Sequence, residues 1–226
     1  MDGVQTHSTW LTAARWLLQV LIPVVLVLTS VRLLLTRGFI QLEYSLPGFP
    51  EDRYGFTQAD RLQQAPIALD YLLNNAGVDF LGDLTFADGS PVYNPRELSH
   101  MQDVKSVVRG ALWVWRGGGL LALGLGLLIW RYAGGSALAS SLEGGSKITL
   151  WLMLAIFLGL VLAFSVLFVG FHQVFFDPNT WTFLFSDTLI RLFPERFWQV
   201  AFGAVALGTG AMAGTLWAVA RRILRG

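Results

Sequence analysis

Residues 148–171 read ITLWLMLAIFLGLVLAFSVLFVGF, an apolar run without a charged side chain. About 20 apolar residues are enough for a helix to cross the hydrocarbon core of a bilayer. Three further apolar runs of similar length lie before and after it, and together they predict four transmembrane helices. We place these helices at about 16–35, 108–130, 148–171 and 197–220.

The composition agrees with a membrane protein. Hydrophobic residues make up 54% of the chain and charged residues only 14%, against about 25% charged residues in soluble domains. A length of 226 residues leaves room for a single membrane domain, 1–226, with an extramembrane insert. The first apolar run is too long for a cleaved signal peptide, so we interpret it as an uncleaved span. The predicted fold class is an all-α membrane protein.

Short basic segments predict the orientation in the cell membrane. Arg221, Arg222 and Arg225 follow the last span, and Arg131 and Lys147 bound a short loop between the second and third spans. Such segments stay in the cytoplasm. Both termini of this multi-pass protein are therefore predicted inside, with two connections outside, at about 38–107 and 173–195. All but two of the 15 acidic residues fall in these outer loops.

The first outer loop contains signals for local structure. Thr57 and Asp60 form a capping-box pattern that opens a helix ending near Asn75. Residues 84–93 read as a short hairpin, because two apolar stretches flank an Asp-Gly turn.

A second helix start follows, with Asn94 as N-cap, Pro95 at the first helical position and Glu97 at the third. The helix is expected to continue directly into the second span. Glu97, His100 and Asp103 follow each other at intervals of three, so one helix face presents an imidazole between two carboxylates.

The second outer loop begins at His172, directly after the third span, and is rich in aromatic residues such as Phe175 and Trp181. This composition predicts an interfacial segment in the lipid headgroup zone. Two histidines at one membrane face suit acid/base chemistry on a lipid. The plainer interpretation remains open, with His100 paired to a carboxylate on the surface and His172 reaching toward the headgroups.

Several other classes of site find little support. The chain has no cysteine, which excludes a thiol nucleophile and disulfides. The zinc spacing His-Glu-x-x-His and the Gly-x-Ser-x-Gly elbow are absent, so neither a metal nor a serine hydrolase is expected. A net charge of +1 gives no indication of nucleic acid binding. Lys105 and Arg116 either extend toward the headgroups or grip an ester carbonyl or phosphate.

Two motifs resemble those of the bacterial lipoprotein intramolecular transacylase family, whose members are four-span membrane proteins. These are Glu-x-x-His-Met-x-Asp-Val-Lys at 97–105 and Phe-His-x-Val-Phe-Phe at 171–176. The resemblance covers nearly the whole chain. It implies a substrate lipoprotein whose N-terminal cysteine carries a diacylglyceryl thioether and a free amino group. The enzyme moves the sn-2 acyl chain from glycerol to that amine and leaves a lyso-form lipoprotein, without a cofactor.

By this resemblance His100 and His172 form the essential pair. Our hypothesis makes His100 the principal base, oriented by Glu97 or Asp103, while His172 serves as acid or oxyanion donor. Donors for the oxyanion include backbone N–H groups, and Phe175 and Trp181 belong to the aromatic segment that holds acyl chains. The side chains assigned to oxyanion or substrate binding are Lys105, Arg116, Trp181 and Phe175. Alternative readings are a hydrolase or acyltransferase acting on another lipid, and a non-enzymatic membrane protein that binds lipid or protein.

Overall fold

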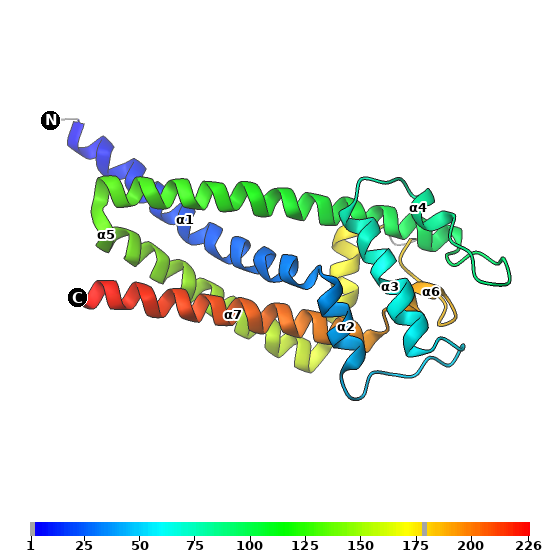
Figure 1. Ribbon diagram of the computed structural model, residues 1–226. Helices are drawn as coiled ribbons and strands as arrows, with labels where there is room; N and C mark the ends of the chain where they lie inside the picture. Colours follow the sequence, from blue (N-terminus) through cyan, green and yellow to red (C-terminus); the bar gives the residue numbers. More distant parts are fainter. Residues whose placement is uncertain (1–2, 178–179) are drawn as a thin grey trace. The chain divides into compact units, whose positions relative to one another are not determined.

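The computed structural model describes residues 3–177 and 180–226, and within them it is helical, which confirms the all-α prediction (Figure 1). The seven helices of the described residues are α1 (Gly3–Leu34), α2 (Arg37–Ser45), α3 (Gln58–Leu73), α4 (Asp79–Gly82), α5 (Pro95–Phe175), α6 (Thr188–Leu192) and α7 (Glu195–Arg225).

Three of these helices are long and apolar enough to cross a membrane. They are α7, α5 and the part Thr9–Leu34 of α1. The second and third expected spans both belong to α5, which contains 81 residues and reverses its direction within its length (Figure 1). Where the sequence predicts a short loop, the chain stays helical and turns at Gly134, whose φ is +83°. A left-handed backbone at this point favours glycine.

The predicted hairpin forms its turn but not its strands. Gly89 adopts a φ of +82° in the Asp-Gly turn, and the Phe86 N–H donates to the Ser90 carbonyl at 2.8 Å. A single antiparallel bridge joins Thr85 and Pro91. On the other side of this bridge the Val92 N–H donates to the Leu84 carbonyl at 2.9 Å, so Pro91, which has no N–H, lies between the two hydrogen bonds.

The chain divides into two compact units. The first holds α1 as far as Arg32, together with Leu112–Leu158 and Ala204–Gly226. Its core contains the buried Leu18 and Ile22 of α1. A side chain at Gly145 would lie 2.5 Å from Ile22, so this glycine allows α1 and α5 to approach closely.

The second unit holds Leu33–Ala111 and Gly159–Gly203, and it contains both candidate histidines. Its helix α3 begins with the predicted capping box, in which Thr57 and Asp60 bond each other's backbone N–H groups. The helix continues through Pro66 to Leu73. Two hydrophobic clusters pack against α3, and the main one contains Ala68, Tyr71, Leu81, Val92, Tyr93, Met101, Leu189 and Leu192.

A buried carboxyl in the second unit lacks hydrogen bonds. Glu43 of α2 is 1% exposed, and neither carboxylate oxygen has a hydrogen-bond partner. Arg196 places its Nε 3.9 Å from Oε1. Burial raises the pKa of Glu43 above its ordinary value, and the charge of Arg196 offsets this effect in part.

This raised pKa predicts a pH dependence of stability. The native carboxyl keeps its proton to a higher pH than the unfolded one, so stability falls as pH rises above the ordinary value of about 4.5 and levels off above the native pKa. We expect the unfolding temperature in detergent to drop over this window in the wild type and to drop less in Glu43→Gln. The exposed Glu51 provides the matched control. A profile of Glu43→Gln that coincides with those of the wild type and Glu51→Gln would contradict the assignment.

Candidate active site

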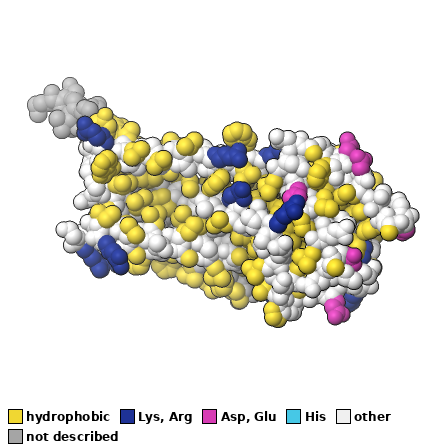
Figure 2. Space-filling view, in the orientation of Figure 1, with side chains coloured by type: hydrophobic (Ala, Val, Ile, Leu, Met, Phe, Trp, Pro, Cys, Tyr) yellow, Lys and Arg dark blue, Asp and Glu magenta, His cyan; other side chains and the backbone are white. Residues whose placement is uncertain are grey.

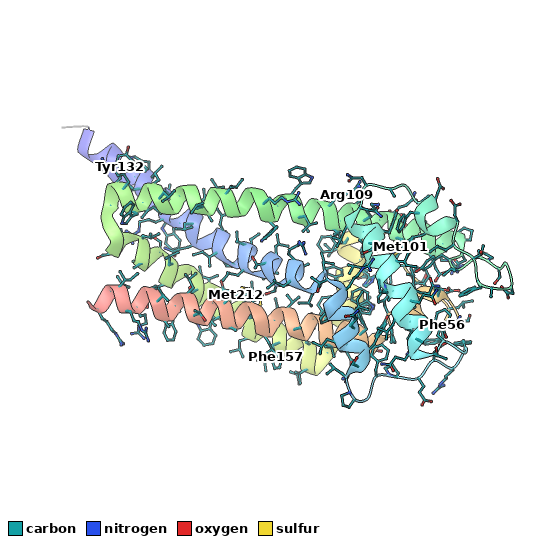
Figure 3. The ribbon with its side chains drawn as sticks, viewed as in Figure 1. Phe56, Met101, Arg109, Tyr132, Phe157 and Met212 are labelled. Carbon is teal, nitrogen blue, oxygen red and sulfur yellow. The ribbon has the colours of Figure 1, made fainter. Side chains whose placement is uncertain are left out.

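The start of α5 fixes the register of the first histidine. The Asn94 side chain accepts the N–H groups of Arg96 and Glu97, and Glu97 Oε2 accepts the Asn94 N–H at 2.8 Å. This confirms the predicted helix start. Met101, labelled in Figure 3, is buried in the main cluster of the second unit. With that side chain in the core, the preceding His100 lies at the edge of the cluster.

Glu97 serves a second helix as well. Its Oε1 accepts the N–H of Leu189 at 2.6 Å, and its side chain is almost fully buried. Both carboxylate oxygens are therefore used by backbone N–H groups, one in α5 and one in α6. Among the described residues no hydrogen bond joins Glu97 to His100, so the orienting role rests on the sequence alone while the contacts show helix capping.

His100 lies in an aromatic environment. It is 8% exposed, and its ring centroid is 4.9 Å from that of Phe176 and 5.3 Å from that of Phe183, both approached edge to face. Its Nδ1 is buried without a hydrogen-bond partner. A buried polar atom without a partner beside a second histidine marks a place where a ligand atom can bind.

His172, in the last turn of α5, faces His100. The two ring centroids are 6.2 Å apart and the ring planes differ by only 16°. The Nδ1 of His172 is 2.8 Å from the carbonyl oxygen of Phe168. Since a carbonyl only accepts hydrogen bonds, Nδ1 carries the hydrogen of the neutral ring and Nε2 is left as the acceptor.

Trp181, in the segment between α5 and α6, completes this group. Its ring centroid is 5.0 Å from that of His172, and its indole Nε1 is buried without a hydrogen-bond partner. Phe168 and Phe176 also contact His172, with centroids at 4.2 and 5.3 Å. The site thus combines two imidazoles and one indole N–H inside a wall of phenylalanine rings.

The remaining predicted residues are less closely tied to the histidines. Asp103 is partly buried, and no hydrogen bond joins it to His100 in the described part of the chain. Burial and the neighbouring His172 lower the pKa of His100 to about 4, and the charge of Asp103 offsets this shift in part. Phe175 is 48% exposed and packs against Phe171. Arg116 belongs to the first unit, where its guanidinium lies 5.5 Å from the ring centroid of Trp113.

The ammonium group of Lys105 is hydrogen-bonded at the end of α3. Its Nζ donates to the Ala76 carbonyl at 2.6 Å and to the Asn74 side chain at 3.1 Å, and it lies 3.8 Å from the ring centroid of Tyr71. Arg109, labelled in Figure 3, donates to the Asn74 carbonyl. Both cations therefore anchor the chain after α3, where helix-end carbonyls attract positive charge.

Sequence reasoning missed three parts of the site. The rings of Phe176 and Phe183 enclose His100, and the carbonyl of Phe168 holds His172. The contact between His172 and the Phe168 carbonyl could have been predicted, because a helical side chain reaches back to the residue four positions earlier. No signal in the sequence singled out Phe183 among the many aromatic residues of its loop. The described residues contain no group of three or more His, Cys, Asp or Glu residues able to hold a metal ion.

Comparisons with known proteins agree with this architecture. The structure of the integral membrane lipoprotein intramolecular transacylase Lit from Bacillus cereus, determined in meso, superposes with a TM-score of 0.78. The match covers 96% of this chain and 97% of that one at 18% sequence identity. A mutant of the same protein superposes with a TM-score of 0.75 at 17% identity, covering 99% of this chain and 96% of that one. These likenesses establish the fold.

The sequence itself establishes the family. A functionally uncharacterized protein of Aquifex aeolicus (strain VF5) is 31% identical over 215 residues, which covers 87% of this chain and 92% of that protein. The family model of the lipoprotein intramolecular transacylase Lit matches residues 16–198. The chain therefore belongs to the Lit family of membrane-bound lipoprotein acyltransferases.

Proposed function

We propose that this protein moves the sn-2 acyl chain of a diacylglyceryl lipoprotein to the α-amino group of its N-terminal cysteine and releases a lyso-form lipoprotein. The family supplies the reaction class. The observation that carries the proposal is the face-to-face pair of His100 and His172, 6.2 Å apart between ring centroids inside an aromatic wall. No cofactor takes part, since acid/base groups are all that the transfer requires.

The chemistry suits this pair. An α-amino group titrates near pH 7.7–8.0, so it must lose a proton before it can attack an ester. An imidazole, ordinarily near 6.5, accepts such a proton and can return it to the leaving glycerol oxygen. Amine and ester belong to one molecule, so holding them together replaces the need for a protein nucleophile.

The tautomer of His172 indicates which histidine accepts a proton and which one delivers it. With Nδ1–H held by the Phe168 carbonyl at 2.8 Å, Nε2 is the free acceptor, as in other sites where a second group orients the catalytic imidazole. We therefore assign the removal of the amine proton to His172. His100 then delivers a proton to the glycerol oxygen. This reverses the roles that the sequence predicts. The lowered pKa of His100 suits a group that releases a proton, and the charge of Asp103 opposes this shift only in part.

The surroundings of the site support an acyl substrate. Phe175, Leu184 and Phe185 leave 48%, 65% and 80% of their side chains exposed around the second outer loop. Exposed apolar surface of this extent fits contact with lipid tails. We assign Phe175 and Trp181 to binding the acyl chains, with membrane lipids and the diacylated lipoprotein as partners of this surface.

The same proposal includes the orientation in the membrane. It keeps the four spans predicted from the sequence, with both termini in the cytoplasm and the histidines facing the outside. On the face shown in Figure 2, hydrophobic side chains spread over the long helices and acidic side chains gather near α3 and α4. Among the described residues of the first unit, Glu143 is the one acidic residue. Basic short segments and acid-poor spans together support this topology.

A synthetic diacylglyceryl lipopeptide tests the function. The lipopeptide is incubated with the detergent-purified protein, and fragment ions locate the acyl chain on the nitrogen or on glycerol. We expect the N-acylated lyso product. Loss of the acyl chain without N-acylation would indicate a hydrolase, and an unchanged lipopeptide would refute transacylation of this substrate.

A further inference from the structure

The reaction needs a donor that the cationic side chains do not provide. When the amine attacks the ester, negative charge develops on the carbonyl oxygen, and a positioned N–H or O–H must stabilise it. Lys105 is bound to Asn74 and Ala76, and Arg116 belongs to the first unit. Within the second unit Lys105 therefore supplies no donor beside the histidines.

Trp181 has such a donor available. The indole Nε1–H is buried and has no acceptor, while the ring lies 5.0 Å from that of His172 between centroids. An indole N–H can only donate, so the group missing at this position is an acceptor such as a carbonyl oxygen. Burying an unpaired donor destabilises a protein, so a donor of this kind beside the histidines calls for a ligand that completes it.

We propose that the indole N–H of Trp181 binds the ester carbonyl oxygen and stabilises the oxyanion during acyl transfer. This proposal rests on the proposed function. The amine nitrogen forms a bond to the carbonyl carbon, the carbonyl π electrons move to oxygen, and Trp181 donates to that oxygen. When the tetrahedral intermediate collapses, the bond to the glycerol oxygen breaks. The amine proton passes through the histidine pair to that oxygen.

The neutral indole suits this position for electrostatic reasons. A cation buried among these phenylalanine side chains would lose its hydration without gaining a counter-ion. A neutral N–H presents a dipole to the substrate at a much smaller desolvation cost. In a site that excludes water, one such dipole stabilises a developing oxyanion far more than it does in solution. Trp181 therefore adds transition-state stabilisation without adding a titrating group.

Two tryptophan variants separate this role from a structural one. Trp181→Phe keeps an aromatic ring and removes the donor, so we expect kcat to fall by about 10²-fold or more with little change in KM. Any fall in its unfolding temperature should reflect only the smaller ring packed against His172, because the N–H has no partner to lose. Trp198 Nε1 donates to the Phe193 carbonyl at 3.1 Å. Trp198→Phe should therefore lower the unfolding temperature and largely keep kcat.

Two further measurements isolate the N–H itself. Replacing Trp181 with benzothienylalanine keeps the shape of the indole and should lower kcat as Trp181→Phe does. A lipopeptide whose ester carbonyl oxygen is replaced by sulfur, a weak acceptor, should slow the wild type more than Trp181→Phe. Equal slowing of both enzymes, or a benzothienylalanine variant with wild-type kcat, would overturn the role of Trp181 alone. A wild type that transfers no acyl chain would overturn the proposed function as well.

Discussion

Replacing His172 with asparagine should lower the rate of acyl transfer by about 10²–10⁴-fold, the usual loss when a general base is removed. Asparagine places its amide nitrogen near the position of Nδ1, so it can still donate to the Phe168 carbonyl, which is 2.8 Å from Nδ1 in the wild type. Only the accepting Nε2 is lost. The measurement is the initial rate of N-acylation of the synthetic lipopeptide, followed by mass spectrometry.

The partner histidine should give a loss of the same order. His100→Asn removes the other imidazole of the pair, and the double variant should lose little more than either single variant, because groups that act as a unit are not additive. Gln173→Ala alters an exposed neighbour of His172 and serves as the control. Wild-type rates in His172→Asn would show that the base lies elsewhere.

Replacing Glu97 with alanine should lower the free energy of unfolding by about 2–5 kcal/mol, because two backbone N–H groups lose a charged acceptor. These are the N–H groups of Asn94 in α5 and Leu189 in α6, at 2.8 and 2.6 Å from the carboxylate oxygens. The loss should appear as a lower unfolding temperature in detergent. Activity per folded molecule should change much less than it does in the histidine variants.

Asp103→Asn is the matched comparison, since Asp103 shares the helix with Glu97 and makes no hydrogen bond within the described residues. We expect its unfolding temperature to stay close to that of the wild type. The opposite result for Glu97→Ala, unchanged stability with a large fall in kcat, would restore the sequence-based hypothesis that Glu97 orients His100.

Helix starts were the most accurately predicted features. The capping patterns at Thr57 and at Asn94 both form as expected, because a cap involves side chains and N–H groups within three residues of each other. The reversal of α5 was not predicted as helix. A single glycine at position 134 with a φ of +83° replaces the expected loop, and many glycines in the chain could have adopted that conformation.

Glu97, predicted with Asp103 to flank His100, shows where helical spacing misleads. Glu97 and His100 do share one side of α5, but Glu97 bonds the N–H of Leu189 instead. That partner lies far away in the sequence, and no local rule brings it to the start of α5. Lys105 is a similar case, because its acceptors Asn74 and Ala76 belong to the end of another helix.

The amino-acid sequence by itself determined that the protein is an all-α membrane protein, where α3 and α5 start, and which two histidines belong to the family motifs. Hydropathy and capping depend on residues close together in the chain, so they can be read without a structure. Only the tertiary structure decided that the two imidazoles face each other at 6.2 Å and that the indole N–H of Trp181 is buried without an acceptor. These features depend on packing between distant segments, where an ångström of displacement changes which atoms can meet.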